Sequence, residues 1–599
     1  MQASRRTRLG RCGPRALLTA TLVLVLAGCD LTTTRTLAPD SSAGLLPSGP
    51  TLPSSTVVPF SASAYPPDGP APCAEAAPPD VDHAAYTGNL RRIRAEEPGI
   101  VVFELCRPDV AFRARLAHPS FGIADSGWLI SQIDPAPDSD PAIATVINGT
   151  GPFRFEVWNR GSDLSFVRNE DYWAGTAVPE RLVFTWSGAS SERLTALVKG
   201  DVDGVDGLTA AELAVAIDME DISVALRPGL STLYLGMNDR YAPFDLDLVR
   251  RAIAIGIDRA DVVERAFPFG TKVATHSSPC ALEFGCVGPA WLQYDPVRGK
   301  ELLAEAGLAD GFSTTLRYPD EAREYLPDPE GTAIAIRDQL EANLGIVTTL
   351  EAVPFETLVG DAEAGRLDGL HLLGARPRIT DVSAVLEPRF GAAASDEFGD
   401  QLDDVVAALE AGAATVDPEA RAAAYAQANR TLRLLAPAVP IAHPGSAAAF
   451  LVDVLDAVAS PTGTERFDEM TPGDRRQLVW LQATEPGSLF CADETDPDAL
   501  RACAQASEGL YGYATGSATV EPRLATACEP DGALSTWTCT IRGDVRFHDG
   551  ATLDASDVVS TFALQWDADH PRHRGRTGTF GTFERLFGGF LHPAAAPPG

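Results

Sequence analysis

Short apolar segments alternate with stretches of helical pattern through the middle of the chain, between residues 233 and 373. The apolar segments have the length of buried strands and cover residues 233–237, 311–318, 346–353 and 370–373. Between them, Asp247, Asp258 and Asp295 are each placed to cap a helix, because an aspartate can accept hydrogen bonds from the free backbone N–H groups of a first turn. Strands joined by helices in this way predict an α/β lobe with a mostly parallel sheet.

The length of the chain calls for more than one such unit. At 599 residues it exceeds what a single hydrophobic core usually holds, so we expect two or more lobes. The formal charge of −34 comes from 82 acidic and 48 basic residues. It argues against nucleic acid as a partner, because phosphate binding needs clustered Lys and Arg. The acidity is most simply explained by solubility.

The first residues have the pattern of an export signal. Five arginines between positions 5 and 15 precede an apolar run, 16–27, that is too short to span a bilayer stably. The run ends Leu-Ala-Gly-Cys, and this string resembles the lipobox of bacterial lipoproteins. The resemblance implies removal of residues 1–28 and a diacylglyceryl group on Cys29, as the only membrane attachment. The alternative is an ordinary signal peptide with an incidental cysteine.

Eight cysteines remain once Cys12, in the signal, and the lipidation candidate Cys29 are set aside. An even number in an exported chain favours disulfides, and the lack of any C-x-x-C spacing argues against a zinc site. We predict four bridges between cysteines that are neighbours in sequence, because three such pairs each enclose a short loop. The candidates are Cys73, Cys106, Cys280, Cys286, Cys491, Cys503, Cys528 and Cys539.

The central segment also carries a specific string. Asn238 is followed by Pro-Phe at 243–244, by Val-Arg-Arg-Ala-Ile at 249–253 and by Ile-Asp-Arg at 257–259. This order resembles the lobe-crossing segment of the oligopeptide- and dipeptide-binding lipoproteins of ABC importers, which form extracellular solute-binding protein family 5.

Three further strings resemble parts of the same family. Those at 149–155 and 168–173 resemble signature turns of its large lobe, and the string at 437–443 resembles the segment that returns to the first lobe. The resemblance implies a two-lobed, periplasmic-binding-protein-like α/β fold of class II, the large peptide-binding type with an extra subdomain.

More than a hundred residues follow this return segment. Strings among them at 508–510, 546–550 and 557–559 resemble the N-terminal motifs of the family in family order, and those motifs are missing upstream of Tyr86. The resemblance therefore implies a circular permutation, with the family's former termini joined through residues 456–477. The alternative is a fusion of two gene fragments that do not complete each other.

The domain division that follows from a permutation is discontinuous. It comprises a signal peptide at 1–28, a flexible linker at 29–59, a first lobe with the small subdomain at 60–235 and 445–599, and a second lobe at 236–444. The linker assignment rests on its richness in Thr, Ser, Pro and Gly.

The sequence carries no recognisable catalytic string. It lacks G-x-S-x-G, S-x-x-K, H-E-x-x-H and P-loop patterns, so we expect a binder that is not an enzyme and uses no metal or cofactor. An EF-hand loop counted from Asp201 would need glycine where Asp206 stands, so this segment is predicted to be a helix-to-strand connection.

The resemblance also implies a function. It indicates a monomeric, extracytoplasmic substrate-binding lipoprotein that closes on a peptide or other small solute by hinge bending and delivers it to an ABC permease with its ATPase subunits. The alternatives are an exported hydrolase on the same scaffold, and a receptor or adhesin that has lost transport.

The peptide-binding relatives carry Gly-Trp and, three positions after the Trp, an Asp that pairs with the α-ammonium of the peptide. The corresponding stretch here is 374–381, which places Ala375 at the Trp and Arg378 at the Asp. A guanidinium repels an ammonium and suits a carboxylate, phosphate or sugar hydroxyl. The alternative is that Arg376 and Arg378 pair with Asp381 or other acids. Family position implies that the ligand-binding residues are Gly374, Ala375, Arg376, Arg378, Glu508, Gly509 and Leu510.

Overall fold

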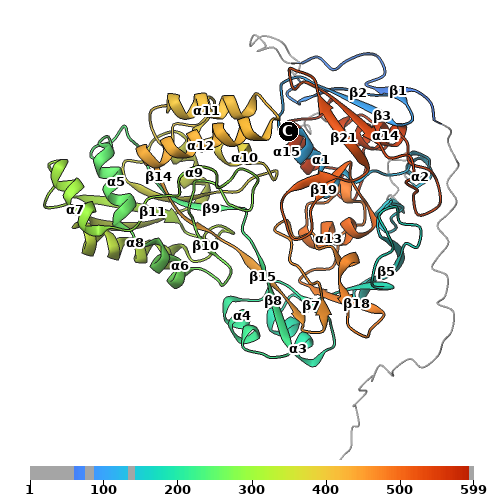
Figure 1. Cartoon of the computed structure of the whole chain (residues 1–599), viewed down its shortest axis with the longest axis horizontal. Helices are drawn as coiled ribbons and strands as arrows, with labels where there is room; N and C mark the ends of the chain where they lie inside the picture. Colours follow the sequence, from blue (N-terminus) through green and yellow to red (C-terminus); the bar gives the residue numbers. More distant parts are fainter. Residues whose placement is uncertain (1–59, 74–85, 133–141, 593–599) are drawn as a thin grey trace, which may run out of the picture. The chain divides into compact units, whose positions relative to one another are not determined.

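The computed structural model describes residues 60–73, 86–132 and 142–592 (Figure 1). The predicted signal peptide, Cys29 and the predicted linker lie outside these residues. Within the described part of the chain, no helix combines the length and the apolar character needed to cross a membrane.

A five-stranded sheet is built from both ends of the described chain. Its strand order is β1 (Ser63–Tyr65), β2 (Leu90–Glu97), β3 (Ile100–Leu105), β22 (Thr536–Ile541) and β21 (Ala525–Pro530). β3 and β22 are antiparallel, with Phe103 opposite Trp537. In Figure 1 the blue strands β1–β3 lie beside the red β21 and α14 (Ala555–Trp566). Residues more than 400 positions apart therefore share one core, which includes Phe103, Trp537 and Phe562.

Short elements complete this part of the molecule. They are α1 (Phe112–Leu116), α2 (Ser126–Gln132), α15 (Gly581–Phe587) and a hairpin of β19 (Tyr511–Tyr513) with β20 (Val520–Pro522).

A seven-stranded sheet also combines the two ends of the chain. Its order is β4 (Phe153–Asn159), β5 (Asp163–Arg168), β6 (Arg181–Trp186), β18 (Gln477–Gln482), β7 (Gly204–Val205), β15 (Ser446–Leu451) and β8 (Ile222–Arg227). β18 lies between β6 and β7 and is parallel to both. Phe184, Phe450 and Trp480 fill the core of this sheet.

Three helices and a strand pair accompany the seven-stranded sheet. They are α3 (Ser190–Lys199), α4 (Ala210–Ile217), α13 (Pro497–Ala506) and the pair β16 (Val454–Leu455) and β17 (Thr471–Pro472). The segment from 200 to 205 joins α3 to β7, which confirms the predicted helix-to-strand connection.

A six-stranded sheet comes from one continuous segment, 232–443. Its order is β10 (Lys272–Val273), β14 (Ala438–His443), β9 (Thr232–Met237), β13 (Leu370–Ala375), β11 (Ser313–Pro319) and β12 (Val347–Val353). Its helices are α5 (Asp247–Gly256), α6 (Arg259–Ala266), α7 (Pro296–Glu305), α8 (Pro329–Leu344), α9 (Phe355–Glu363), α10 (Ser383–Phe390), α11 (Asp403–Ala413) and α12 (Pro418–Leu435).

The predicted mostly parallel order of this sheet is wrong. Only β11–β12 and β11–β13 are parallel, whereas β10–β14, β14–β9 and β13–β9 are antiparallel. The reason lies in the path of the chain. β9 brings the chain into the sheet and β14 takes it out again, so these two strands run in opposite directions side by side at its centre.

Two of the three predicted helix caps are present. Asp258 accepts hydrogen bonds from the backbone of α6, and Asp295 accepts one from the backbone N–H of Arg298 in α7. The expected cap at Asp247 is wrong, because α5 begins one residue earlier than predicted and Leu246 is its N-cap. Asp247 lies in the first turn instead, where its charge still favours the helix dipole.

Two short segments carry the chain between the seven-stranded and six-stranded sheets. β8 leads to β9 through 228–231, and β14 leads to β15 through 444–445. The two crossings touch: a Cβ on Gly229 would lie 1.9 Å from the carbonyl oxygen of Pro444. A Cβ on Gly445 would lie 2.9 Å from the carbonyl oxygen of Arg227. Only glycine permits this approach of the two backbones.

The four disulfides join cysteines that are neighbours in sequence, as predicted. The pairs are Cys73–Cys106, Cys280–Cys286, Cys491–Cys503 and Cys528–Cys539.

Candidate functional site

The candidate site is a cavity of about 880 Å³ that is lined by both crossings. Residues 227–230 and 444–446 form one side of it, and residues 376–380, which follow β13, form another. Pro119, Thr464 and Arg585 represent further stretches on its wall. A space of this size suits a small organic molecule. The cavity therefore draws its walls from the continuous segment 232–443 and from both ends of the chain.

Charged side chains around the cavity are predominantly basic. They are Arg227, Glu324, Arg376, Arg378 and Arg585. Arg227 is neutralised, because its Nη2 lies 2.5 Å from Glu465 and 3.3 Å from Asp206. Arg376 pairs with Glu324 at 2.9 Å.

The two remaining arginines have no acidic partner. Among the described residues, Arg378 makes no hydrogen bond or ion pair, and Arg585 donates only to the hydroxyl of Thr582 at 3.1 Å. Burial lowers the pKa of Arg585, and the positive charges of Arg378 and Arg376 lower it further. Arg585 is thus close enough to Arg378 and Arg376 to be repelled by both.

Neutral hydrogen-bonding groups fill much of the remaining wall. They are supplied by His118, Thr380, Ser446, Thr462, Thr464, Thr495, Tyr513 and Thr582. Burial lowers the pKa of His118 to about 4, and the charge of Arg585 acts in the same direction. Nδ1 of this neutral ring accepts a hydrogen bond from the backbone N–H of Ser120, so Nε2 carries the proton and can donate it.

The four candidate ligand-binding residues in the 374–381 stretch do not all lie on the cavity wall. Arg376 and Arg378 lie on the cavity wall. Gly374 and Ala375 are in β13 and face the interior: a Cβ on Gly374 would lie 2.3 Å from the ring of Tyr325, and Ala375 is buried. Asp381, the acid considered as a partner for the arginines, pairs with Arg421 at 3.0 Å instead.

The candidates near residue 508 lie beside the cavity. Glu508 and Gly509 line a smaller pocket of about 70 Å³, which shares Pro119, Thr464 and Tyr513 with the larger one. Leu510 is buried in the core of the five-stranded sheet.

The carboxylate of Glu508 binds the chain itself. It accepts hydrogen bonds from Tyr172 at 2.7 Å, Trp173 at 2.9 Å and Thr150 at 3.1 Å. These partners belong to the two turn strings singled out in the sequence. Burial raises the pKa of Glu508, and the three donors act against that rise.

Sequence reasoning missed Arg227 and Arg585. Arg227 ends a strand just before a crossing, and a Pro-Gly pair after it is a detectable turn signal. Arg585 lies in α15, far along the chain, and no motif surrounds it.

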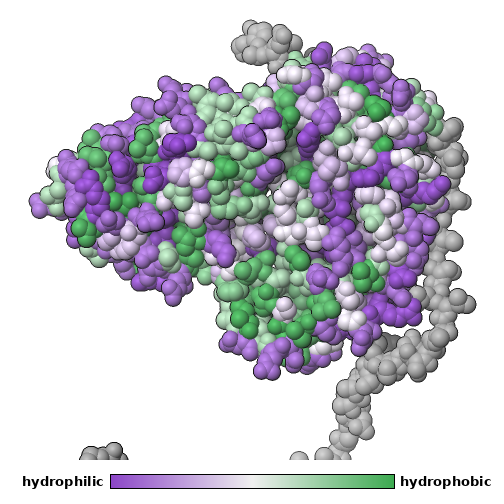
Figure 2. Space-filling view, in the orientation of Figure 1, coloured by the Kyte–Doolittle hydropathy of each residue, from purple (hydrophilic) through white to green (hydrophobic). Residues whose placement is uncertain are grey.

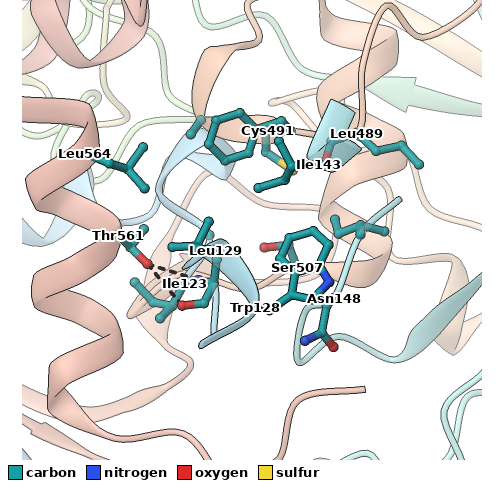
Figure 3. A pocket seen from close by; sticks show the side chains of 15 residues that line it. Ile123, Trp128, Leu129, Ile143, Asn148, Leu489, Cys491, Ser507, Thr561 and Leu564 are labelled. Carbon is teal, nitrogen blue, oxygen red and sulfur yellow. Dashed lines mark hydrogen bonds between the residues drawn. The ribbon is translucent and has the colours of Figure 1, made fainter. Parts of the chain in front are cut away.

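Two other features of the described residues do not compete with this site. A pocket lined by Ile123, Trp128 and Leu489 is apolar and holds about 30 Å³, too little for an organic ligand (Figure 3). His276, Cys280 and Cys286 are the one group with metal-ligand spacing among the described residues, but the two sulfurs are joined to each other.

An apolar surface area lies over α3 and α4 (Figure 2). Its exposed side chains include Val198, Val215 and Ile217. None of them lines the cavity.

The arrangement of sheets and cavity is that of a mixed α/β binding protein. The structure of HbpA2 from Haemophilus parasuis superposes with a TM-score of 0.56 over 64% of this chain and 75% of that one, at 23% identity. The pattern of the bacterial extracellular solute-binding proteins, family 5 Middle, matches residues 60–396 and 519–583. The chain belongs to this family.

Two relatives match this chain over similar lengths. A probable ABC transporter periplasmic-binding protein, SapA of Escherichia coli, is 24% identical over 399 residues, which is 65% of this chain and 71% of that protein. Di/tripeptide-binding protein 1 of Pseudomonas aeruginosa is 25% identical over 389 residues, 64% of this chain and 72% of that one. Family membership makes the chain a solute-binding protein, and the family is one of binding proteins and not of enzymes.

Proposed function

We propose that the chain is the substrate-binding lipoprotein of an ABC importer, which captures a peptide or other small solute between two lobes and delivers it to a membrane permease. The observation that carries this proposal is the cavity of about 880 Å³, because both crossings line it. A hinge at the crossings allows one lobe to close over a solute held there. The names of the relatives, a transporter-associated protein and a di/tripeptide-binding protein, agree with it.

The proposed lobes follow the sheets. The second lobe is the segment 232–443 with its six-stranded sheet, and the first lobe is made of the described residues on either side of it. We place the first boundary in the crossing 228–231 and not at the expected 235/236, because β9 belongs entirely to the six-stranded sheet. The expected boundary at 444/445 already falls in the second crossing and is kept.

The proposed first lobe is circularly permuted relative to the family. The two segments that match the family run in chain order, so the support comes from strand pairing. β22 joins β3, and β18 lies between β6 and β7. The end of the described chain also meets its beginning: Thr87 donates a hydrogen bond to the carbonyl of Gly588 at 2.8 Å. Two unrelated gene fragments would have no reason to complete each other's sheets.

Membrane attachment through Cys29 and contact with permease and ATPase subunits complete the proposal. Both rest on the lipobox-like string and on the family, and neither needs a metal, a cofactor or nucleic acid. We propose that the protein acts as a monomer.

A thermal-shift screen of the mature chain tests the function. Peptides, sugars and organic acids are added singly, and a true ligand raises the melting temperature in a saturable way. Ser446→Trp places an indole ring in the cavity and is expected to abolish the shift in melting temperature. Ser556→Trp on α14, outside the cavity wall, serves as a control.

Three experimental results would contradict the proposed function. Release of product from a hit favours a hydrolase on this scaffold. A shift that survives Ser446→Trp places the ligand elsewhere. Binding to a host surface with no response to any solute favours a receptor or adhesin.

A further inference from the structure

The basic character of the cavity wall stands out against the composition of the whole chain. Acidic residues outnumber basic ones by 82 to 48 in the sequence, yet four arginines and one glutamate line the cavity. The charge of the cavity wall is thus opposite in sign to that of the chain as a whole. It points to a requirement of the ligand.

The four arginines fall into two classes. Arg227 is locked in place: its side chain is 14% exposed, and Glu465, its partner, is fully buried. Arg376 is loosely held, because it is 71% exposed and its partner Glu324 is 57% exposed. An ion pair as exposed as this one contributes little stability, so Arg376 is free to change partners.

Arg378 and Arg585 have no carboxylate partner among the described residues. They come from distant parts of the chain, the loop after β13 and helix α15, and the fold brings them to one wall. Glu324 pairs with Arg376, and Arg227 is neutralised by its buried acidic partners. Among the described residues, the positive charges of Arg378 and Arg585 therefore have no counter-charge in the cavity. Like charges in proximity cost free energy, which a bound anion would recover.

On the basis of the proposed function, we propose that the solute is a small organic anion with at least two acidic groups, carboxylate or phosphate, which bind Arg378 and Arg585. Guanidinium groups bind both kinds of oxyanion in bidentate fashion. The hydroxyls of Thr462 and Thr495 can donate to the same oxygens or to the body of the solute.

The same charges select against solutes that lack acid groups. A peptide with a free ammonium and no acidic side chain would bring its positive charge to a wall that carries four arginines and one acid, Glu324. A neutral sugar would leave the two guanidinium groups without counter-charge. The structure thus favours a dianion over either.

Calorimetric titration of the mature chain tests this inference with matched probes. Dicarboxylates from malonate to adipate are compared with their diamides, which have the same shape without the charge. Inorganic pyrophosphate and glycerol phosphate separate phosphate from carboxylate recognition, and a dipeptide without charged side chains and glucose represent the other classes.

We expect a diacid to bind and its diamide to fail. Arg378→Gln and Arg585→Gln should each weaken binding about 10- to 100-fold, the range for a lost hydrogen bond to a charged group. Affinity should fall between about 20 mM and about 0.5 M salt, because the interaction is electrostatic. Arg91→Gln, on an exposed position of β2 outside the cavity, is the control and should change nothing.

The melting temperature of the variants distinguishes a loss of binding from a loss of folding. Removing Arg378 should leave the melting temperature of the free protein unchanged or higher, because the residue has no partner to lose and repulsion from Arg376 and Arg585 is relieved. A loss of binding then reports on the ligand and not on unfolding.

Two results overturn the inference in different ways. If a neutral or cationic solute binds and both arginine variants keep its Kd, the ligand class is wrong and the binding function stands. If no probe of any class binds the unaltered chain, the proposed function fails together with the inference.

Discussion

Gly229 and Pro444 lie so close that a single added methyl carbon at Gly229 would stand 1.9 Å from the Pro444 carbonyl oxygen. The contact ties the outgoing crossing to the returning one. Because both crossings line the cavity, any change in their contact is felt where the solute is proposed to bind.

Gly229→Ala should therefore destabilise the protein by about 2–3 kcal/mol, since the clash is with backbone and not with a flexible side chain. Urea unfolding measures the effect. Gly360→Ala is the matched control: it lies within α9 with open space where the methyl would go, and should stabilise by about 0.5–1 kcal/mol. Equal stabilities of the Gly229 variant and the unaltered chain would show that the crossings do not pack as described.

A second prediction concerns the buried ion pairs beneath the first crossing. Glu465 is fully buried and binds Arg227 at 2.5 Å and Arg501 at 2.8 Å. Glu465→Gln leaves two arginine charges short of a partner, so it should cost about 3–5 kcal/mol in the free energy of unfolding. Glu469→Gln removes a partly exposed ion pair with Arg466 and keeps an amide oxygen that can accept the hydrogen bond from Thr515, so it should cost less than about 1 kcal/mol.

The carboxylate of Glu465 should also make the free energy of unfolding depend on pH. Burial disfavours the charge on Glu465, but the charges of Arg227 and Arg501 outweigh burial and lower its pKa to about 2, from an ordinary 4.5. The unfolded chain then binds more protons than the native one between these values, so stability is lost as the pH falls through this range. Unfolding of the unaltered chain and of Glu465→Gln, followed from pH 7 to 3.5, should converge; parallel curves would contradict the assignment.

Glu387 should act in the opposite direction. Burial raises its pKa to about 7, and the charges of Asp381 and Asp109 add to the rise. The native chain therefore binds more protons than the unfolded one from about 4.5 to 7, and stability falls as the pH rises through this window. Glu387→Gln should remove this part of the slope and raise the melting temperature at pH 8 by a few degrees. Scans between pH 5 and 8 that show the same slope in both proteins would refute it.

The disulfide Cys491–Cys503 joins the segment before α13 to the helix itself. Replacing both cysteines with serine should lower the free energy of unfolding by about 2–3 kcal/mol, because the unfolded chain regains the freedom of that loop. Denaturant unfolding under non-reducing conditions measures this. An unchanged midpoint would mean that the bridge adds no constraint.

Local signals in the sequence predicted local structure well. The caps at Asp258 and Asp295 and the connection after α3 depend on residues within a few positions of one another, and all are present. The four disulfides are also present and join cysteines that are 33, 6, 12 and 11 positions apart. Strand direction in the six-stranded sheet was mispredicted, because it depends on where the chain enters and leaves that sheet. No short segment records this.

The candidate site likewise combines residues that the sequence pointed to with residues that only the fold brings there. Arg376 and Arg378 were found from the resemblance of the 374–381 stretch to the ligand-binding segment of the family, and they lie on the cavity wall. Gly374 packs against the ring of Tyr325, a contact from a separate loop, and Ala375 is buried in another hydrophobic cluster of the six-stranded sheet and its helices. Arg585 reaches the cavity only through the folding of the C-terminal part onto the N-terminal part, so no spacing in the sequence pointed to it.

The claim on which the account rests most is that the residues after 445 and those before 228 form one lobe. A reordered chain tests it: residues 474–592, then a Gly/Ser linker of about 12 residues that spans about 20 Å, then residues 60–473. The opening between Gly473 and Asp474 lies on a loop and keeps Glu465 in one segment with Arg227. We predict that this chain folds with the same circular dichroism spectrum and the same four disulfides, and binds the same solute with unchanged Kd. A reordered chain that is insoluble, or that folds but no longer binds, would contradict the single-lobe account.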